Sequence, residues 1–420
     1  MTHQHKNIEI MAPVGSYDAL MAALQGGADS VYFGVENLNM RSRSSNNFTL
    51  DDLKNIASIA QKNQVKTYLT LNTIIYDHEI ELMKRIVDTA KEAEITAVIA
   101  SDISVIQYAH SKMVEVHIST QANVTNIEAV KFYAQFADVM VTARELTIDQ
   151  LAEITRQIRL QNITGPKGEL IRIEIFAHGA LCMAVSGKCY LSLHAMNQSA
   201  NRGACLQVCR RSYRLVDIEM DNQIEVDNEY LMSPKDLWTI HFLNKILDAG
   251  VSVLKIEGRA RSPEYVRTVV ECYSEAVDAW YNDDYTDDRI DVWKSRLESV
   301  FNRGFWNGYY LGQRLGEWNH RYGSRATQRK VFIGRVTNYY TNLQVAEISP
   351  DANQFSIGDR LLITGPTTGV KYHDVQEIRE NDQSVTTTKQ GVPCSIKIEA
   401  KLRRSDKVFK IVDADQVKQQ

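Results

Sequence analysis

The sequence predicts an α/β protein: a (β/α)8 barrel of the TIM type followed by a small antiparallel β-barrel. Strand–helix alternation repeated eight times favours the closed barrel over an open doubly wound sheet. From residue 331 onward, short alternating strands separated by turns are typical of an antiparallel barrel. Eight apolar or β-branched runs, typical of strands covered on both faces, lie at residues 8–14, 30–35, 65–71, 96–100, 114–119, 138–142, 171–177 and 251–256.

Segments with helical periodicity lie between these runs. Ser16 is placed to cap the first of them, and Thr49, Asp51 and Asp52 form an N-terminal signature for the second. Two further helices are expected after the eighth strand, before the chain changes character. The expected helices cover residues 16–26, 50–62, 78–93, 127–137, 147–159, 263–280 and 289–302.

The connection between the seventh and eighth strands, residues 180–250, is far longer than an ordinary βα unit. It predicts a β-hairpin with a turn at Asp221–Asn222, then a helix capped by Ser233 and running over 237–247. The predicted layout is therefore a barrel domain at 1–311 with a cysteine-rich insertion at 180–232, a linker at 312–330 and a C-terminal domain at 331–420.

Composition describes an ordinary globular chain. The 420 residues carry a formal net charge of −4, so the overall charge does not indicate a nucleic-acid or membrane partner. No apolar run approaches the roughly 18 residues of a membrane-spanning helix, and the first residues lack the pattern of a signal peptide. We therefore expect a cytoplasmic protein, in which clustered cysteines stay reduced.

Residues 174–213 combine cysteines, glycines and arginines. Cys182, Cys189, Cys205 and Cys209 are separated by six, fifteen and three residues. Four thiolates select zinc, Cu(I) or an iron–sulfur cluster. Only the last pair has the close spacing usual in structural zinc sites, and the residues alone leave a cluster, zinc and plain thiols open. The other two cysteines, at positions 272 and 394, fit core positions in a helix and a strand.

The run EIFAHGALCMAVSGKCYLS followed by NQSANRGACLQVCRRSY resembles the signature of peptidase family U32, the collagenase-like proteases of unassigned catalytic type. The opening IEIMAPVGSYDALMAALQGGADSVYFG, STQANVTN after the fifth strand and LKIEGRARSPEYV after the eighth are also similar to that family. The resemblance covers essentially the whole chain. Within the family, length and layout are most similar to the bacterial prephenate-dependent tRNA hydroxylation proteins.

This resemblance implies an iron–sulfur protein that makes 5-hydroxyuridine at the tRNA wobble position without oxygen. It implies a 4Fe-4S cluster on Cys182, Cys189, Cys205 and Cys209, with prephenate as the hydroxyl source. It further implies tRNA as a partner, and a family paralogue as a possible partner subunit.

Polar side chains follow the predicted strands at the end where a barrel keeps its active site. Asn72, Gln121 and Arg144 are candidates for substrate binding, although each also fits a plain loop residue. Lys255 and Glu257, two apart at the eighth strand, are candidates for a catalytic acid–base pair or a structural ion pair. His178 could move a proton near the substrate, or fill a core position.

Cationic residues gather at the same predicted mouth. Arg202, Arg210 and Arg259 are candidates for an anion-binding rim that could hold an RNA backbone or the carboxylates of prephenate. Scattered surface arginines are the alternative. The other rim candidates are Arg41, Arg43, Arg211, Arg214 and Arg261.

Two other classes of function stay open. A peptidase needs an activated nucleophile or a metal-bound water, and the sequence has no HExxH or GxSxG motif. A scaffold that carries a cluster for a partner subunit is the other alternative.

Overall fold

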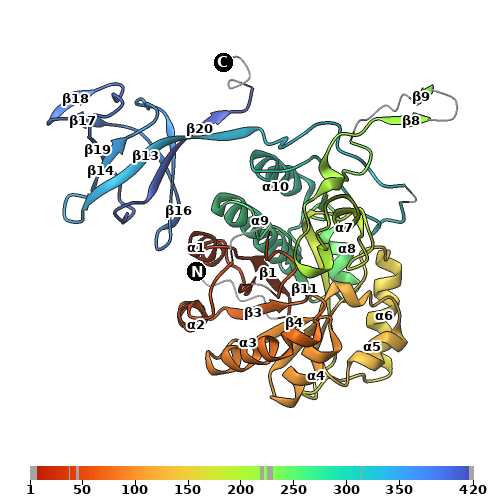
Figure 1. Ribbon diagram of the computed structural model, residues 1–420. Helices are drawn as coiled ribbons and strands as arrows, with labels where there is room; N and C mark the ends of the chain where they lie inside the picture. The colour runs from red at the N-terminus through yellow and green to blue at the C-terminus, as the bar shows by residue number, and fades with distance from the viewer. Residues whose placement is uncertain are drawn as a thin grey trace.

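The computed structural model describes residues 7–36, 38–43, 47–217, 222–224, 230–313 and 315–415. Its two main parts are a barrel surrounded by helices and a smaller β-domain at the C-terminal end (Figure 1). Among the described residues, no helix is long and apolar enough to cross a membrane.

Eight parallel strands form the closed barrel that the sequence predicts. The last strand, β11, pairs with both β1 and β7, and this double pairing closes the sheet. Alternate side chains fill the interior, including Met11, Tyr68 and Ile99. The strands are β1 Glu9–Pro13, β2 Ser30–Phe33, β3 Lys66–Leu71, β4 Ala97–Ala100, β5 Glu115–Ile118, β6 Val139–Val141, β7 Arg172–Ala180 and β11 Val253–Ile256.

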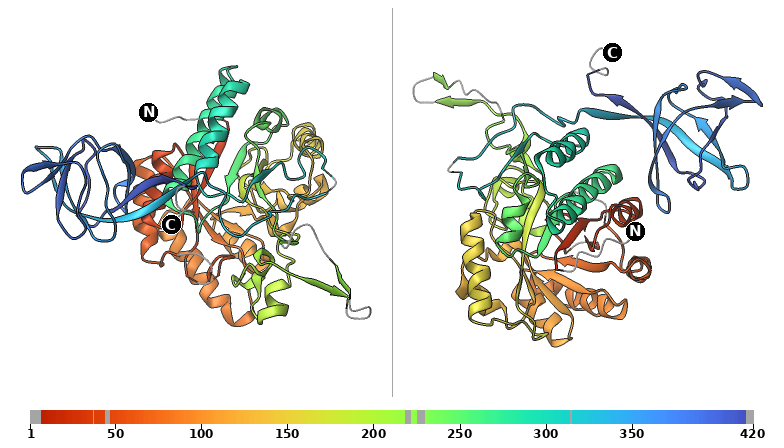
Figure 2. Two further views of the ribbon diagram at one scale, coloured as in Figure 1. Left: turned by 90° about the horizontal axis from the view of Figure 1, so that it is seen from above. Right: turned by 180° about the vertical axis from the view of Figure 1, so that it is seen from behind.

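Helices pack around the outside of the barrel (Figure 2). The predicted caps are partly right. Ser16 accepts a hydrogen bond from the Ala19 amide at 3.2 Å, and Asp52, the first residue of α2, accepts one from the Thr49 amide at 2.8 Å. The predicted set lacked α4, which Asp102 caps. The helices are α1 Tyr17–Gln25, α2 Asp52–Lys62, α3 Ile80–Glu92, α4 Ile103–Ser111, α5 Ile127–Tyr133, α6 Ile148–Leu160, α8 Leu243–Asp248, α9 Pro263–Tyr281 and α10 Asp287–Ser299.

The long connection from β7 to β11 lies over the carboxyl ends of the strands. It contains α7 Leu191–Met196 and the short 3-10 turns η3 Ala200–Arg202 and η4 Val208–Arg210. The predicted hairpin is confirmed as β8 Leu215–Asp217 paired with β9 Asn222–Ile224, and it projects from the body of the molecule (Figure 1). Its turn, at 218–221, lies outside the described residues.

The helix predicted from Ser233 is wrong in its first half. Residues 236–238 form strand β10 (Asp236–Trp238), which pairs with the end of β7 and with β12 (Phe305–Trp306). Because β7 extends beyond the barrel, its free backbone groups need a partner, and β10 supplies them. Leu237 is 2% exposed at this junction, so tertiary pairing overrides the helical start signal.

The C-terminal domain is an antiparallel sheet of eight strands with its own core, which includes Cys394. It docks on the barrel domain through α1 and α9. The Gln25 side chain donates to the carbonyl of Thr368 at 2.8 Å and accepts from the amide of Val370 at 2.9 Å. The strands are β13 Gln328–Tyr340, β14 Val345–Pro350, β15 Arg360–Gly365, β16 Gly369–Asp374, β17 Ile378–Glu380, β18 Gln383–Val385, β19 Cys394–Lys397 and β20 Lys407–Asp413.

Candidate active site at the mouth of the barrel

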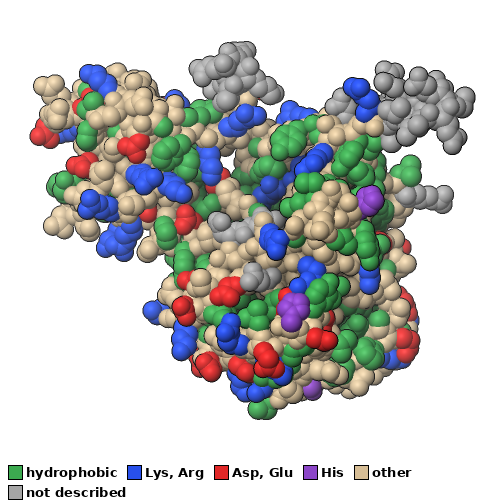
Figure 3. Space-filling model, viewed as in Figure 1, with side chains coloured by type: hydrophobic (Ala, Val, Ile, Leu, Met, Phe, Trp, Pro, Cys, Tyr) green, Lys and Arg blue, Asp and Glu red, His purple; other side chains and the backbone are tan. Residues whose placement is uncertain are grey.

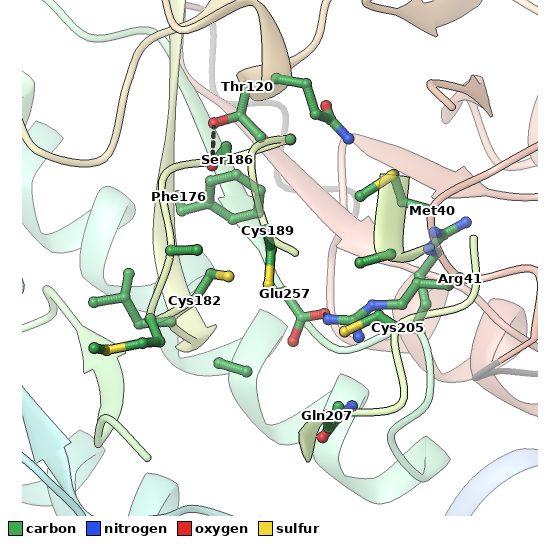
Figure 4. A pocket seen from close by; sticks show the side chains of 18 of the residues that line it. Met40, Arg41, Thr120, Phe176, Cys182, Ser186, Cys189, Cys205, Gln207 and Glu257 are labelled. Atoms are coloured by element: carbon green, nitrogen blue, oxygen red, sulfur yellow. Dashed lines mark hydrogen bonds and ion pairs between the residues drawn. The ribbon is translucent and has the colours of Figure 1, made fainter. Parts of the chain in front are cut away.

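A cavity of about 250 Å³ lies between the carboxyl ends of the barrel strands and the insertion that follows β7. Tyr32 on β2 and Phe176 on β7 contribute the aromatic part of its wall. Asn72 follows β3, and Gln121 lies in the 3-10 turn η2 (Thr120–Ala122) after β5. The barrel thus supplies the floor of the cavity and the insertion supplies its cover (Figure 4).

All four cysteines of the insertion line this cavity. Cys182 follows β7, Cys189 precedes α7, Cys205 lies between the turns η3 and η4, and Cys209 belongs to η4. The sulfur atoms of the first three point into the same space, around the carboxylate of Glu257 (Figure 4). The structure therefore brings together four thiols that the sequence separates by as many as fifteen residues.

The chain holds these loops by local hydrogen bonds. The Leu206 amide donates to the Ser192 hydroxyl at 3.1 Å, and the Tyr213 hydroxyl donates to the Val208 carbonyl at 2.5 Å. Burial raises the pKa of the Cys209 thiol to about 11; the Arg210 guanidinium lowers this pKa, and the three neighbouring cysteines raise it. Ionised thiolates in this cavity thus need a compensating positive centre.

The donor set fits a cluster better than a single ion. Within the described part of the chain, no three His, Cys, Asp or Glu side chains lie close enough to hold one metal ion. Four thiols around an open cavity of about 250 Å³ instead leave room for a group of several atoms. All-cysteine ligation by four thiolates is the pattern of a 4Fe-4S cluster.

Positive charge dominates the cavity wall, in which Glu257 is the only Asp or Glu among the described residues. Three of the cations have carboxylate partners close by, and one of them is Lys255, which lies 2.7 Å from Glu174. Arg41 lies 3.0 Å from Glu257, and Arg303, which the sequence analysis missed, lies 3.3 Å from Asp236. The cationic residues in the wall are Arg41, Arg144, Arg210, Lys255, Arg259, Arg261 and Arg303.

Arg144 and Arg259 have no carboxylate within 4 Å among the described residues. The Arg144 guanidinium stacks over the Phe176 ring at 4.0 Å, and its buried Nε has no hydrogen-bond partner. Arg259, only 7% exposed, donates to Asn39 Oδ1 at 3.1 Å and to Thr70 Oγ1 at 2.8 Å. Burial lowers the pKa of Arg259 to about 10. The guanidinium groups of Arg144 and Arg259 are therefore positive charges that no described carboxylate neutralises.

A glycine makes room for Arg259. A Cβ atom built on Gly34, directly after β2, would lie 2.7 Å from the Arg259 Nη1 atom. The side chain of any other residue would therefore displace this guanidinium from its place. In the sequence, this glycine is visible only as the second residue of the FG pair at the end of the second strand. Nothing in the local sequence pattern connects that pair to Arg259.

The predicted pairing of Lys255 with Glu257 is wrong. Lys255 forms its ion pair with the fully buried Glu174 on β7 at 2.7 Å, whereas Glu257 pairs with Arg41. Glu257 lies just beyond the end of β11, where the regular alternation of side chains has stopped. Both residues nevertheless line the cavity, as predicted.

The two groups keep their charges in different ways. Burial lowers the pKa of Lys255, and the contact with Glu174 opposes that shift. Burial raises the pKa of Glu257, but four guanidinium groups together, Arg41 first among them, hold the pKa below its usual value. The second carboxylate oxygen of Glu174 is buried without a hydrogen-bond partner. The catalytic roles of Lys255 and Glu257 stay predictions.

His178 does not line the cavity. It is 1% exposed and lies among the rings of Tyr265, Tyr273 and Phe305. Burial lowers its pKa to about 3, so the ring is neutral at physiological pH. The side chain fills the core behind the cavity wall, which is the alternative that the sequence left open. Its catalytic role remains untested.

Two predicted arginines hold the insertion in place. Arg202 lies outside the cavity wall, pairs with Glu79 at 2.5 Å and stacks over the Tyr76 ring at 3.9 Å. Arg210 lines the cavity and donates to the Leu181 carbonyl at 2.6 Å and to the Ser233 hydroxyl at 3.1 Å. The contact of Arg202 with Glu79 ties the insertion to the barrel. The contacts of Arg210 fix its side chain in the cavity wall.

Asn72 and Gln121 are brought together, as predicted. The Asn72 amide donates to Ser119 at 3.3 Å and to Gln121 at 3.5 Å, and its oxygen accepts from the Met40 amide at 3.2 Å. Both line the cavity. Their amides form a polar edge that can recognise a ligand by hydrogen bonds.

The chain belongs to peptidase family U32. The family model matches residues 15–320. A collagenase of Porphyromonas gingivalis is 56% identical over 404 residues, which cover 96% of this chain and 98% of that protein. Tertiary comparison gives a U32 peptidase structure with 12% identity and a TM-score of 0.38, covering 60% of this chain and 93% of the other.

More distant relatives carry names from RNA modification. A tRNA hydroxylation protein of Bacillus subtilis is 31% identical over 385 residues, covering 90% of this chain and 88% of that protein. A 23S rRNA 5-hydroxycytidine synthase of Escherichia coli is 30% identical over 402 residues, covering 92% of this chain and 57% of that protein. The family resemblance found in the cysteine stretch is confirmed.

Proposed function

We propose that this chain is an iron–sulfur enzyme that hydroxylates the wobble uridine of tRNA to 5-hydroxyuridine without oxygen, with prephenate as the hydroxyl source. The observation that carries the proposal is the shared cavity: four cysteines and more cationic than anionic described side chains line one space. Relatives named for tRNA and rRNA hydroxylation, at 31% and 30% identity, support an RNA substrate.

Cys182, Cys189, Cys205 and Cys209 are the residues that would hold a 4Fe-4S cluster. When bound, such a cluster supplies redox or Lewis-acid chemistry tuned by its surroundings. The chain's contribution is to keep the four loops in register and to surround the sulfurs with positive charge from Arg41 and Arg210, both in the cavity wall. Positive neighbours favour thiolates over thiols.

The free cations would bind the anionic parts of the substrates. Arg144 and Arg259 lack carboxylate partners among the described residues, so each can meet a carboxylate of prephenate with charge-assisted hydrogen bonds. Asn72 and Gln121 offer amides to a uracil edge. Lys255 and Glu257, which both line the cavity, would hold or move a proton at the reacting atoms.

A collagenase-like peptidase is the second candidate, and the name of the 56%-identical relative favours it. The cavity wall argues against it. No histidine is among the described residues that line the cavity, and a serine or cysteine nucleophile needs an adjacent base.

The deciding experiment replaces the gene in its host with the Cys182→Ala variant and measures tRNA nucleosides by mass spectrometry. We expect 5-hydroxyuridine and its derivatives to disappear, and the anaerobically purified variant to lose most of its iron. The matched control is Cys272→Ala, because that thiol is fully buried in α9 away from the cavity.

Unchanged nucleosides in the Cys182→Ala strain, with no paralogue present, would contradict the proposal. Cleavage of gelatin by the purified wild-type protein, abolished by the same substitution, would favour the peptidase. If only the chain together with a family paralogue restores the nucleosides, the two act as partner subunits.

A further inference from the structure

The first part of the insertion, up to residue 216, carries only positive charge, whereas residues 217–229 carry six Asp or Glu. Residues 175–216 contain five Lys or Arg and not one Asp or Glu, in a chain whose formal net charge is −4. Arg210 faces the cavity and Arg202 is paired, but the others are exposed on the surface. The exposed cations are Lys188, Arg211 and Arg214.

Large apolar side chains are exposed on the same segment. Tyr190 is 70% exposed, and Tyr76, on the loop after β3 that touches the insertion, is 51% exposed. Exposed apolar groups that gather in one area mark binding surfaces. The other members of this group are Ile74, Met183, Val185, Leu193, Met196 and Leu206.

This apolar group surrounds the mouth of the cavity. Tyr190 stands between Cys189 and Leu191, which both line the cavity, and Leu206 follows the cavity-lining Cys205. Tyr76 is tied to the insertion by Arg202, whose guanidinium lies 3.9 Å from the centre of its ring. In Figure 3, the area below the hairpin shows green and blue side chains with few red ones, whereas red side chains gather lower on the barrel.

The combination of exposed aromatic rings and unopposed cations fits single-stranded RNA. Proteins read unpaired nucleotides by stacking bases on aromatic side chains or arginine planes, while cations follow the phosphates. A base that reacts inside a cavity must leave its stack, which uncovers its neighbours. Aromatic rings at the mouth are placed to replace that lost stacking.

We propose that the exposed face of the insertion, together with Tyr76, is the docking surface for a single-stranded RNA loop, with Tyr190 stacking on a nucleotide next to the target base. Lys188, Arg211 and Arg214 contact the flanking phosphates. This inference rests on the proposed function for the identity of the target, but it concerns binding only.

The test measures binding of a fluorescently labelled RNA stem-loop with an unpaired uridine-containing loop, by anisotropy, using the anaerobically purified full chain. We expect Tyr190→Ala to weaken binding of the stem-loop by about tenfold or more, since stacking on one base contributes about 1–3 kcal/mol. Tyr190→Phe should bind nearly as the wild type does. Tyr340→Ala is the matched control, because Tyr340 is exposed on the C-terminal domain.

A second arm separates stacking from charge. Arg211→Gln should weaken binding and reduce its salt dependence, whereas Tyr190→Ala should leave the salt slope unchanged. A fully paired duplex should bind much more weakly than the stem-loop. Equal binding of duplex and loop, or of Tyr190→Ala and wild type, would overturn the proposal.

The outcome is independent of catalysis. Loop binding that depends on Tyr190, in a protein whose deletion leaves 5-hydroxyuridine unchanged, would support this surface and refute the proposed reaction. If the Tyr190→Ala variant hydroxylates tRNA normally and binds RNA as the wild type does, the proposed reaction would be supported and the proposed surface would be refuted. No RNA binding, together with a self-association or partner complex that Tyr190→Ala abolishes in sedimentation, would assign the face to a protein and overturn the inference.

Discussion

The two ends of the barrel use charge in opposite ways. At the amino ends of the strands, the buried Glu9 accepts hydrogen bonds from Tyr68 at 2.6 Å and from Lys66 and Arg172 at 2.9 Å. At the carboxyl ends, Arg144 and Arg259 have no carboxylate partner among the described residues. The buried Glu9 at the amino end therefore has cationic partners. The carboxyl end, by contrast, has more cationic than anionic side chains among the described residues.

The difference follows from what each end has to do. Glu115, also at the amino end, contacts His117 at 3.1 Å and Lys167, and its interactions with these two residues outweigh the effect of burial and hold its pKa at about 2. Paired charges at this end stabilise the fold. At the other end, Arg259 is buried and Arg144 is partly buried, and burying a cation that has no carboxylate partner among the described residues costs stability.

A pair of arginine substitutions gives the clearest test of the difference between the two ends of the barrel. Arg259→Met at the mouth should weaken prephenate binding by about 100-fold, because a charge-assisted contact contributes about 1.5–3 kcal/mol. Arg172→Met at the amino end should leave that binding unchanged. Isothermal titration calorimetry with prephenate measures both.

The free energy of unfolding should change more in Arg172→Met than in Arg259→Met, the opposite of the order expected for prephenate binding. Arg172→Met should lower the free energy of unfolding by about 2 kcal/mol, since it removes a partner of the buried Glu9. Arg259→Met should lower it less, because it also relieves repulsion from Arg41. The contrast between the two ends would be lost if both variants impaired prephenate binding equally.

The pH dependence of stability sharpens the same contrast. Burial raises the pKa of Glu9, but Arg172 and Lys66 outweigh it and lower the pKa from 4.5 to about 2. A depressed pKa stabilises the fold above pH 4.5, and that contribution is lost as the pH falls from about 4.5 to about 2.

Glu9→Gln should therefore cost about 2–3 kcal/mol of unfolding free energy at pH 7 and almost nothing near pH 2. Urea unfolding followed by circular dichroism across this range checks it. A cost that is the same at both ends of the range would mean that packing, and not charge, makes Glu9 important.

The smallest effect is expected at Asp29. Burial, reinforced by the charge of Glu9, raises the pKa of Asp29 to about 7, while its carboxylate accepts a hydrogen bond from the Ile10 amide at 2.9 Å. A raised pKa gives stability that is present below pH 3.8 and lost as the pH rises through about 7.

Asp29→Asn keeps an acceptor for the Ile10 amide and removes the charge. It should raise the unfolding free energy by about 1 kcal/mol at pH 8 and change it little at pH 4. The same urea titration at the two pH values gives the answer. Destabilisation at pH 8 would show that the ionised carboxylate is needed.

Several features of the fold follow from local pattern. All eight barrel strands lie where continuous apolar runs occur, because burial on both faces demands such runs. The helix start at Ser233 shows the limit. Its capping residues are sound, yet the free backbone of β7 recruits Asp236–Trp238 as a strand. Pairing with a distant segment leaves no local signal.

The candidate site divides in the same way. Asn72, Gln121, Arg144, Arg259 and the four cysteines could be placed at the cavity from their positions after strands or in the insertion. His178 could not be excluded from it by sequence. A residue at a strand end can face the cavity or the core, and the packing of Tyr265 and Tyr273 decides which.

Strand periodicity and residue type are local properties, so the barrel, the long insertion and the cysteine set could be predicted from the sequence alone. Which charges meet depends on the folded structure. Lys255 pairs with Glu174 and Glu257 pairs with Arg41, whereas Arg144 and Arg259 have no carboxylate within 4 Å among the described residues. Ion pairing falls off over a few ångströms, so it depends on the path of the whole chain. That path assembles the positively charged cavity.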